Sequence, residues 1–278
     1  MMPDHLLYKL IYVLFSAFTE FLPVSPRAHQ KLFALLTGVE MADPMVDLAV
    51  RLGVLIALAV SCKKRIMHLV RANRLARYAR RHRNTHVDTL AIMDTRVLKT
   101  AVIPILLGLL CYRKAESVVN GTASLALSLT VYGILLFIPR IMLIGNKESG
   151  NMSRLDSVLV GVGGALGVIP GFSRIGGIFS LGQMRGVERG YALEMALLLS
   201  IPALLGLLVL DFCTVVLAKL TVTAIGWLCY LFMSVVAFFV GYLAITFLRL
   251  LSAKTGFSRF CYYNWGMAMF AFVLYLMI

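Results

Sequence analysis

The chain has 278 residues, of which 60% are hydrophobic and only 14% are charged. Soluble domains carry about 25% charged residues, so this composition excludes a water-soluble fold and favours a membrane protein. The formal net charge of +14 would suit nucleic-acid binding, but many of the basic residues gather between Lys63 and Arg83, directly after an apolar run. Basic loops beside membrane spans stay in the cytoplasm. We therefore interpret the basic residues as a signal that sets membrane orientation. They are also expected to contact anionic membrane lipids, and no nucleic-acid partner is expected.

Apolar segments follow one another along the whole chain. Long runs such as 221–248 reach the roughly 20 residues that cross about 30 Å of hydrocarbon. Six segments are expected to span fully, at residues 45–62, 97–112, 121–145, 191–218, 221–248 and 260–278. Four shorter segments form two pairs, each flanking a polar turn, at residues 6–22, 30–41, 157–169 and 175–184.

Charge tracing orients these segments. With the basic loop 63–96 in the cytoplasm, the first short pair enters and leaves from outside, and the second pair enters and leaves from inside. The sequence therefore predicts an all-α polytopic membrane protein with about six full transmembrane helices and two oppositely oriented re-entrant helical hairpins, an inverted repeat. We expect one integral membrane domain, residues 1–278, with repeat halves 1–112 and 121–248 and a terminal helix at 260–278.

The first polar turn carries Glu20, Arg27 and His29 beside an apolar stretch. Each ionisable group costs roughly 2.5–3.5 kcal/mol at the centre of a bilayer, so three of them indicate mutual pairing or a hydrated cavity. Paired broken segments in corresponding positions point to a site at the membrane midplane. We expect the two turns to meet and form one polar site. The alternative, two ordinary proline kinks, does not explain the clustered polar residues.

The second turn contains Gly171, Ser173, Arg174 and Gly176. Glycines let backbone N–H groups approach an anion, and a following helix N-terminus offers further donors. The guanidinium of Arg174 matches phosphate geometry. The turn therefore predicts an anionic ligand, either phosphate or carboxylate. A tight contact between helices through small residues is the alternative, and it accounts for the glycines but not for Arg174.

At these two turns the chain resembles the undecaprenyl-diphosphatase family of bacterial membrane enzymes, also called the bacitracin-resistance family. Residues 20–25, which read EFLPVS, and His29 match its first motif, and residues 170–176, which read PGFSRIG, match much of its second. The resemblance implies hydrolysis of undecaprenyl or another polyprenyl diphosphate to the monophosphate, which recycles the cell-wall lipid carrier and supports antibiotic resistance. It also implies a multi-pass protein of the bacterial inner (plasma) membrane.

The resemblance also assigns roles to residues. It implies catalysis by Glu20, Ser25, His29 and Arg174, with Ser25 as the nucleophile and His29 as its proton acceptor or as the acid that protonates the leaving group. Glu20 would hold a divalent cation, Mg²⁺ or Ca²⁺, or would orient His29. The substrate-binding residues would be Arg27, Gly171, Ser173, Arg174 and Gly176.

The chain departs from the family pattern at several positions. Ser16 stands at the family's first glutamate, and Arg51 stands at a glutamine. A single carboxylate makes a weak metal site, and Arg27 or Arg51 could replace a cation's charge. Two other functions therefore stay open, a polyprenyl-phosphate transporter or flippase and a catalytically impaired homologue. A homodimer is left open as the oligomeric state.

Overall fold

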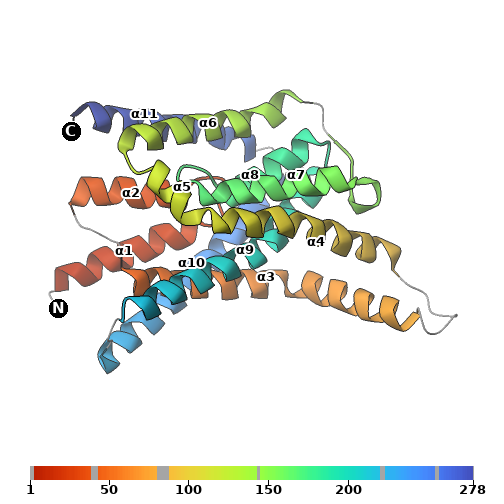
Figure 1. The fold of residues 1–278 in the computed structure, drawn as a ribbon, viewed down its shortest axis with the longest axis horizontal. Helices are drawn as coiled ribbons and strands as arrows, with labels where there is room; N and C mark the ends of the chain where they lie inside the picture. The colour runs from red at the N-terminus through yellow and green to blue at the C-terminus, as the bar shows by residue number, and fades with distance from the viewer. Residues whose placement is uncertain are drawn as a thin grey trace.

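The computed structural model is an elongated bundle of helices (Figure 1). It describes residues 3–38, 43–79, 88–142, 145–219, 223–253 and 257–277. Its α-helices are α1 (Pro3–Thr19), α2 (Pro26–Thr37), α3 (Pro44–Ala79), α4 (Thr89–Leu110), α5 (Tyr112–Val118), α6 (Thr122–Ile141), α7 (Arg154–Ala165), α8 (Arg174–Met184), α9 (Arg189–Leu217), α10 (Ala224–Ala253) and α11 (Phe260–Met277). Short 3₁₀ turns lie at Ser149–Asn151, Leu166–Val168 and Phe257–Arg259.

Within the described residues, five helical segments are long and apolar enough to cross a membrane. They lie in α3, α6, α9 and α10 and at residues 257–277, which include α11. This confirms an all-α polytopic membrane protein. The sixth predicted span, 97–112, falls short of that measure. It lies mostly in α4, whose first half carries Asp94, Arg96 and Lys99.

The predicted basic loop 63–96 is mostly helical, which corrects that expectation. Residues 63–79 continue α3, and residues 89–96 open α4. The stretch contains no glycine or proline to break the helix. The Asn73 side chain also donates hydrogen bonds to Leu69 O and Thr95 Oγ1, which ties the extension of α3 to α4. Residues 80–87 of the prediction lie outside the described residues.

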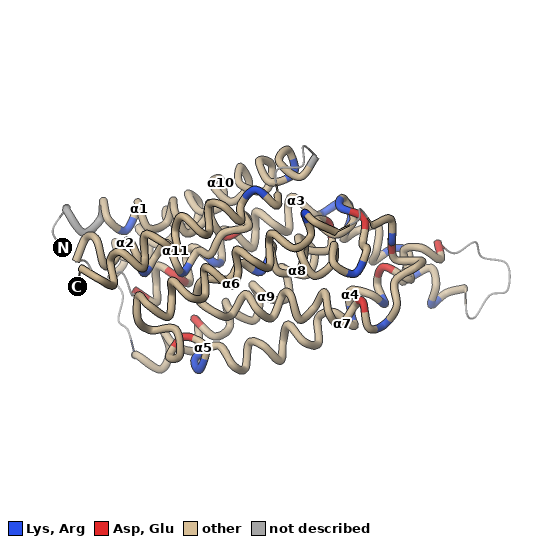
Figure 2. Tube along the Cα trace, turned by 90° about the horizontal axis from the view of Figure 1, so that it is seen from above, with Lys and Arg blue, Asp and Glu red and all other residues tan. Residues whose placement is uncertain are grey.

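The two short pairs form the helical hairpins α1–α2 and α7–α8. The hairpin α1–α2 reaches inward from the end of the bundle that holds both termini, whereas α7 begins at the opposite end (Figure 1). The hairpins therefore enter from opposite ends, as the inverted repeat predicts. Figure 2 shows Lys and Arg gathering at the end where α3 ends and α4 and α7 begin.

Ion pairs close the α7–α8 hairpin at its open end. Asp156, in the first turn of α7, accepts hydrogen bonds from the Ser153 backbone N–H at 3.0 Å and from Arg185 Nε at 2.7 Å. Burial would raise the pKa of Asp156, but these hydrogen bonds lower it to about 2. Asp156 is thus ionised throughout the physiological range and anchors the start of α7 to the end of α8.

Candidate functional site

The two polar turns meet, as the sequence predicts. Ser25 Oγ accepts a hydrogen bond from the backbone N–H of Gly171 at 2.9 Å. In return, Ser173 Oγ donates to the backbone carbonyl of Leu22 at 2.8 Å. Each turn therefore satisfies a backbone group of the other, which non-helical backbone at bilayer depth requires.

The same two serines begin the helices that follow the turns. Ser25 is the N-cap of α2, where its Oγ accepts from the Ala28 N–H, and Ser173 is the N-cap of α8, where its Oγ accepts from the Gly176 N–H. Each is 1% exposed. Because the turns are joined, the N-termini of α2 and α8 meet at the centre of the bundle. Their partial positive charges favour an anion there.

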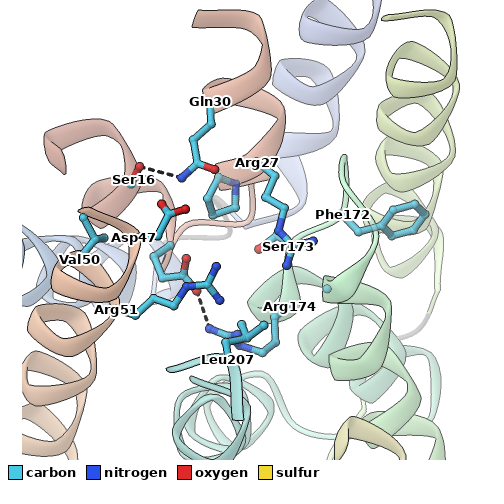
Figure 3. A pocket seen from close by; sticks show the side chains of 13 residues that line it. Ser16, Arg27, Gln30, Asp47, Val50, Arg51, Phe172, Ser173, Arg174 and Leu207 are labelled. Atoms are coloured by element: carbon cyan, nitrogen blue, oxygen red, sulfur yellow. Dashed lines mark hydrogen bonds and ion pairs between the residues drawn. The ribbon is translucent and has the colours of Figure 1, made fainter. Parts of the chain in front are cut away.

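A cavity of about 50 Å³ lies beside the joined turns (Figure 3). Its walls come from α1, α2, α3, α8 and α9 and from the two turns. It is lined by Ser16, Glu20, Pro26, Arg27, Gln30, Asp47, Val50, Arg51, Gly167, Phe172, Ser173, Arg174 and Leu207. Three cations and two carboxylates face this space, so the cavity wall carries a formal charge of about +1 when all of them are ionised.

Arg174 and Glu20 form the central ion pair of this cavity. Arg174 Nη2 donates to Glu20 Oε1 at 2.7 Å, and Arg174 Nε donates to Ser200 Oγ at 3.1 Å. The Arg174 side chain is 8% exposed and the Glu20 side chain is 20% exposed. A buried charge needs such a partner, and removing either one leaves the other uncompensated. The structure thus brings together a predicted residue from each turn.

Arg27 also lines the cavity, as predicted. Its Nη1 donates to the backbone carbonyl of Val168 at 2.8 Å, and its guanidinium lies 4.0 Å from the centre of the Tyr112 ring. Within the described part of the chain, no carboxylate lies within salt-bridge distance of Arg27. Arg27 therefore binds the segment that leads into the second turn while keeping a positive charge at the cavity wall that no salt bridge neutralises.

Ser25 and His29, the predicted nucleophile and base, lie behind the cavity wall. The His29 ring stacks on the Tyr263 ring, with centroids 5.7 Å apart. Its Nδ1 lies 2.7 Å from the Ser25 backbone carbonyl, and its Nε2 contacts the Tyr263 hydroxyl. Because the imidazole contacts the backbone of Ser25 rather than its hydroxyl, their joint catalytic role stays a prediction.

The two glycines of the second turn serve geometry and packing. Gly171 has φ +102°, which favours glycine, and its N–H is already bound by Ser25. A Cβ at Gly176 would lie 1.8 Å from the hydroxyl oxygen of Tyr132. Neither glycine lines the cavity. Gly176 therefore serves a tight contact between α8 and α6, which is the alternative interpretation of the glycines.

Sequence reasoning missed the pair that holds Arg51. Arg51 Nε lies 2.5 Å from Asp211 Oδ2, and Arg51 Nη2 donates to the Tyr112 hydroxyl at 3.2 Å. Asp211 is the only acid in α9 beyond Glu194. A lone acid in a long apolar run is a signal of function, and it could have identified Asp211. Nothing local in the sequence singles out Tyr112.

The cavity offers two carboxylates, Glu20 and Asp47, to the divalent cation that the resemblance implies. Within the described residues, no group of three or more His, Cys, Asp or Glu side chains could hold a metal ion. Glu20 Oε1 is bound by Arg174, and Asp47 accepts a hydrogen bond from Tyr12. Because both carboxylates already have partners and no third acidic, histidine or cysteine ligand lies with them in the described residues, these side chains do not form a preformed site for a resident ion. Metal binding by Glu20 stays a prediction.

Known proteins resemble this chain over nearly its whole length, including both polar turns. The family model described as bacitracin resistance protein BacA matches residues 9–270. The undecaprenyl-diphosphatase of Methanobrevibacter smithii is 30% identical over 274 residues, which cover 96% of this chain and 97% of the relative. That of Carboxydothermus hydrogenoformans is 26% identical and covers 95% of each chain. Undecaprenyl-diphosphatase 1 of Shouchella clausii is 29% identical and covers 96% of each chain.

Proposed function

This chain belongs to the bacitracin resistance protein BacA family, and on that basis we propose that it is a membrane phosphatase that hydrolyses undecaprenyl diphosphate, or a related polyprenyl diphosphate, to the monophosphate. The observation that carries the proposal is the cavity at the joined turns, which carries Arg27, Arg51 and Arg174. This activity supplies the lipid carrier of cell-wall synthesis and supports bacitracin resistance.

The cavity suits a diphosphate for electrostatic reasons. Catalysis of phosphoryl transfer is mostly positioning and stabilisation of the charge on the phosphoryl oxygens. Guanidinium groups bind such oxygens through paired N–H donors, and the N-termini of α2 and α8 add to the same field. The lipid tail of the substrate would remain among the helices, with only its headgroup in the polar cavity.

Glu20 is the acid best placed to act on water in this cavity. When a phosphate oxygen takes the place of Glu20 Oε1 on Arg174, the carboxylate is free to accept a proton. Water would then attack the terminal phosphorus, its proton would pass to Glu20, and the bond from that phosphorus to the bridging oxygen would break. Attack by Ser25 instead requires its Oγ to leave the Gly171 and Ala28 N–H groups.

The orientation belongs to the same proposal. The apolar helices make this a multi-pass membrane protein. We place it in the bacterial cell membrane with the end that holds Lys63, Lys64 and Arg65 in the cytoplasm, because positive charge at span ends favours that side. The α1–α2 hairpin then enters from the external side.

Phosphate release tests the proposal. Purified protein in detergent is mixed with undecaprenyl diphosphate, and inorganic phosphate is measured with and without EDTA. Release that depends on the protein is expected. Lipid translocation across liposomes without phosphate release would overturn hydrolysis and support the transporter, and binding with neither outcome would support an impaired homologue.

A further inference from the structure

An ion pair between α3 and α9 stands out among the charges of the bundle. Arg51 and Asp211 lie 2.5 Å apart, and their side chains are 16% and 13% exposed. Both belong to helices that are long and apolar enough to span a membrane. Ionisable groups at that depth are costly and face a partner or a polar cavity, where they mark functional sites. Arg51 does both, because it binds Asp211 and lines the cavity.

Two of the three Arg51 nitrogens are already held. Nε contacts Asp211, and Nη2 donates to the Tyr112 hydroxyl. The third nitrogen, Nη1, is buried and has no hydrogen-bond partner among the described residues. Figure 3 shows the Arg51 guanidinium pointing into the space between Asp47 and Arg174. A buried donor without a partner demands an explanation, and a ligand oxygen supplies one.

The surrounding groups fix this guanidinium from behind. Asp211 does not line the cavity, so its charge compensates Arg51 without occupying the space in front of it. The Tyr112 hydroxyl accepts a hydrogen bond from Arg51, and the guanidinium of Arg27 lies 4.0 Å from the centre of the Tyr112 ring. One tyrosine thus aligns two cavity arginines. A guanidinium held in this way loses little freedom when it binds phosphate.

We propose that Arg51 is a direct ligand of the substrate diphosphate and that Asp211 and Tyr112 are its positioning residues. The fixed guanidinium would supply positive charge that phosphoryl-transfer sites commonly take from a divalent cation, so the diphosphate binds without a metal ion. This inference rests on the proposed function, because it assumes that the cavity holds a diphosphate. Metal-free binding agrees with the carboxylates of the cavity, which form no preformed cation site in the described residues.

Binding of a non-hydrolysable diphosphate tests the proposal apart from turnover. Methylenediphosphonate is titrated into the full-length protein in detergent by calorimetry, in EDTA. The wild type is expected to bind, and Arg51→Gln is expected to weaken binding by about tenfold to a hundredfold, the range for a hydrogen bond to a charged group. Arg51→Lys, which keeps the charge but not the fork, should fall between them. Arg113→Gln, an exposed arginine beside Tyr112, is the matched control and should bind as the wild type does.

The positioning residues have their own test. Asp211→Asn should weaken diphosphate binding, whereas Asp211→Glu, which keeps the charge, should retain most of the affinity. Tyr112→Phe should weaken binding less than Asp211→Asn does, because it removes only the hydroxyl. These variants also cover the case in which Arg51→Gln does not fold.

Three outcomes would contradict parts of this account. If a folded Arg51→Gln protein binds with wild-type affinity while Arg174→Ala loses binding, the role of Arg51 is overturned and the proposed function stands. Binding by the wild type only with added Mg²⁺ or Ca²⁺ would overturn the metal-free mode. Unchanged binding in both Arg51→Gln and Arg174→Ala would instead count against the proposed function.

Discussion

The two polar turns use the same structural device and supply different chemistry. In each, a serine caps the following helix and bonds to the backbone of the other turn, Ser25 to Gly171 and Ser173 to Leu22. Beyond that device they differ. The second turn presents Ser173 and Arg174 to the cavity, whereas the first turn presents Glu20 and Arg27 and keeps Ser25 behind the wall.

This difference shows that a motif can hold structural and chemical residues side by side. Ser25, Ser173 and the N–H of Gly171 account for how the turns meet. The ionisable residues account for what the cavity can bind. Substitutions that separate these two roles can break or sharpen the comparison.

The largest effect is expected at the arginine of the second turn. Arg174→Ala should lower phosphate release by at least about a hundredfold, because it removes a buried cation of the cavity and leaves Glu20 without its partner. Arg27→Ala in the first turn should cost less, about tenfold, because Arg27 forms no salt bridge with a described carboxylate and its loss breaks no ion pair. Initial rates of phosphate release check the pair, with the exposed Arg154→Ala as control. Equal losses in Arg174→Ala and Arg27→Ala would show that the turns contribute equally.

The next largest effect concerns packing behind the second turn. Gly176→Ala should destabilise the protein by about 1–3 kcal/mol, since the new Cβ meets the Tyr132 hydroxyl. Thermal unfolding in detergent measures this change. Tyr132→Phe removes the hydroxyl, so the double variant should recover part of the loss. No recovery would show that Gly176 is required for another reason.

The two capping serines should then behave alike. Ser25→Ala and Ser173→Ala should each lower stability by about 1–2 kcal/mol, because each loses a cap and a hydrogen bond between turns. Thermal midpoints compare the two variants, and phosphate release is normalised to folded protein. Ser25→Ala should keep measurable turnover. Complete loss of turnover at unchanged stability would establish Ser25 as the nucleophile.

The smallest effect is expected at His29. His29→Gln should reduce phosphate release by less than about tenfold, because the ring contacts Tyr263 and does not line the cavity. Tyr263→Phe should have a similar small effect. Steady-state rates across pH 5–8 measure both variants. A loss of several orders of magnitude in His29→Gln alone would place the imidazole in the reaction.

Much of the fold and site could be predicted from the sequence. Charge along the spans predicts the opposite senses of α1–α2 and α7–α8, and the paired broken segments with their clustered ionisable groups predict that the two turns meet in one polar site. Those inferences depend on local patterns and on the expense of charge in a membrane.

What could not be predicted depends on how distant helices align. The Arg51–Asp211 pair and the place of Tyr112 follow from the rotation of α3 and α9 and the start of α5, which no local pattern fixes. The direction of His29 also depends on Tyr263 in α11, far along the chain. Helix α3 continues to Ala79, beyond the expected span 45–62, because charged residues do not end a helix that extends into water.

Photo-crosslinking of a diphosphate tests the central claim most directly, namely that the joined turns hold the anion. A photoreactive polyprenyl diphosphate analogue is bound to the full-length protein, and the labelled peptides are identified by mass spectrometry. The account predicts labels within residues 16–30 and 167–174, and their loss in Arg174→Ala. Labels confined to the arginine-lined cavity at Arg140, Arg189 and Arg259 would contradict it.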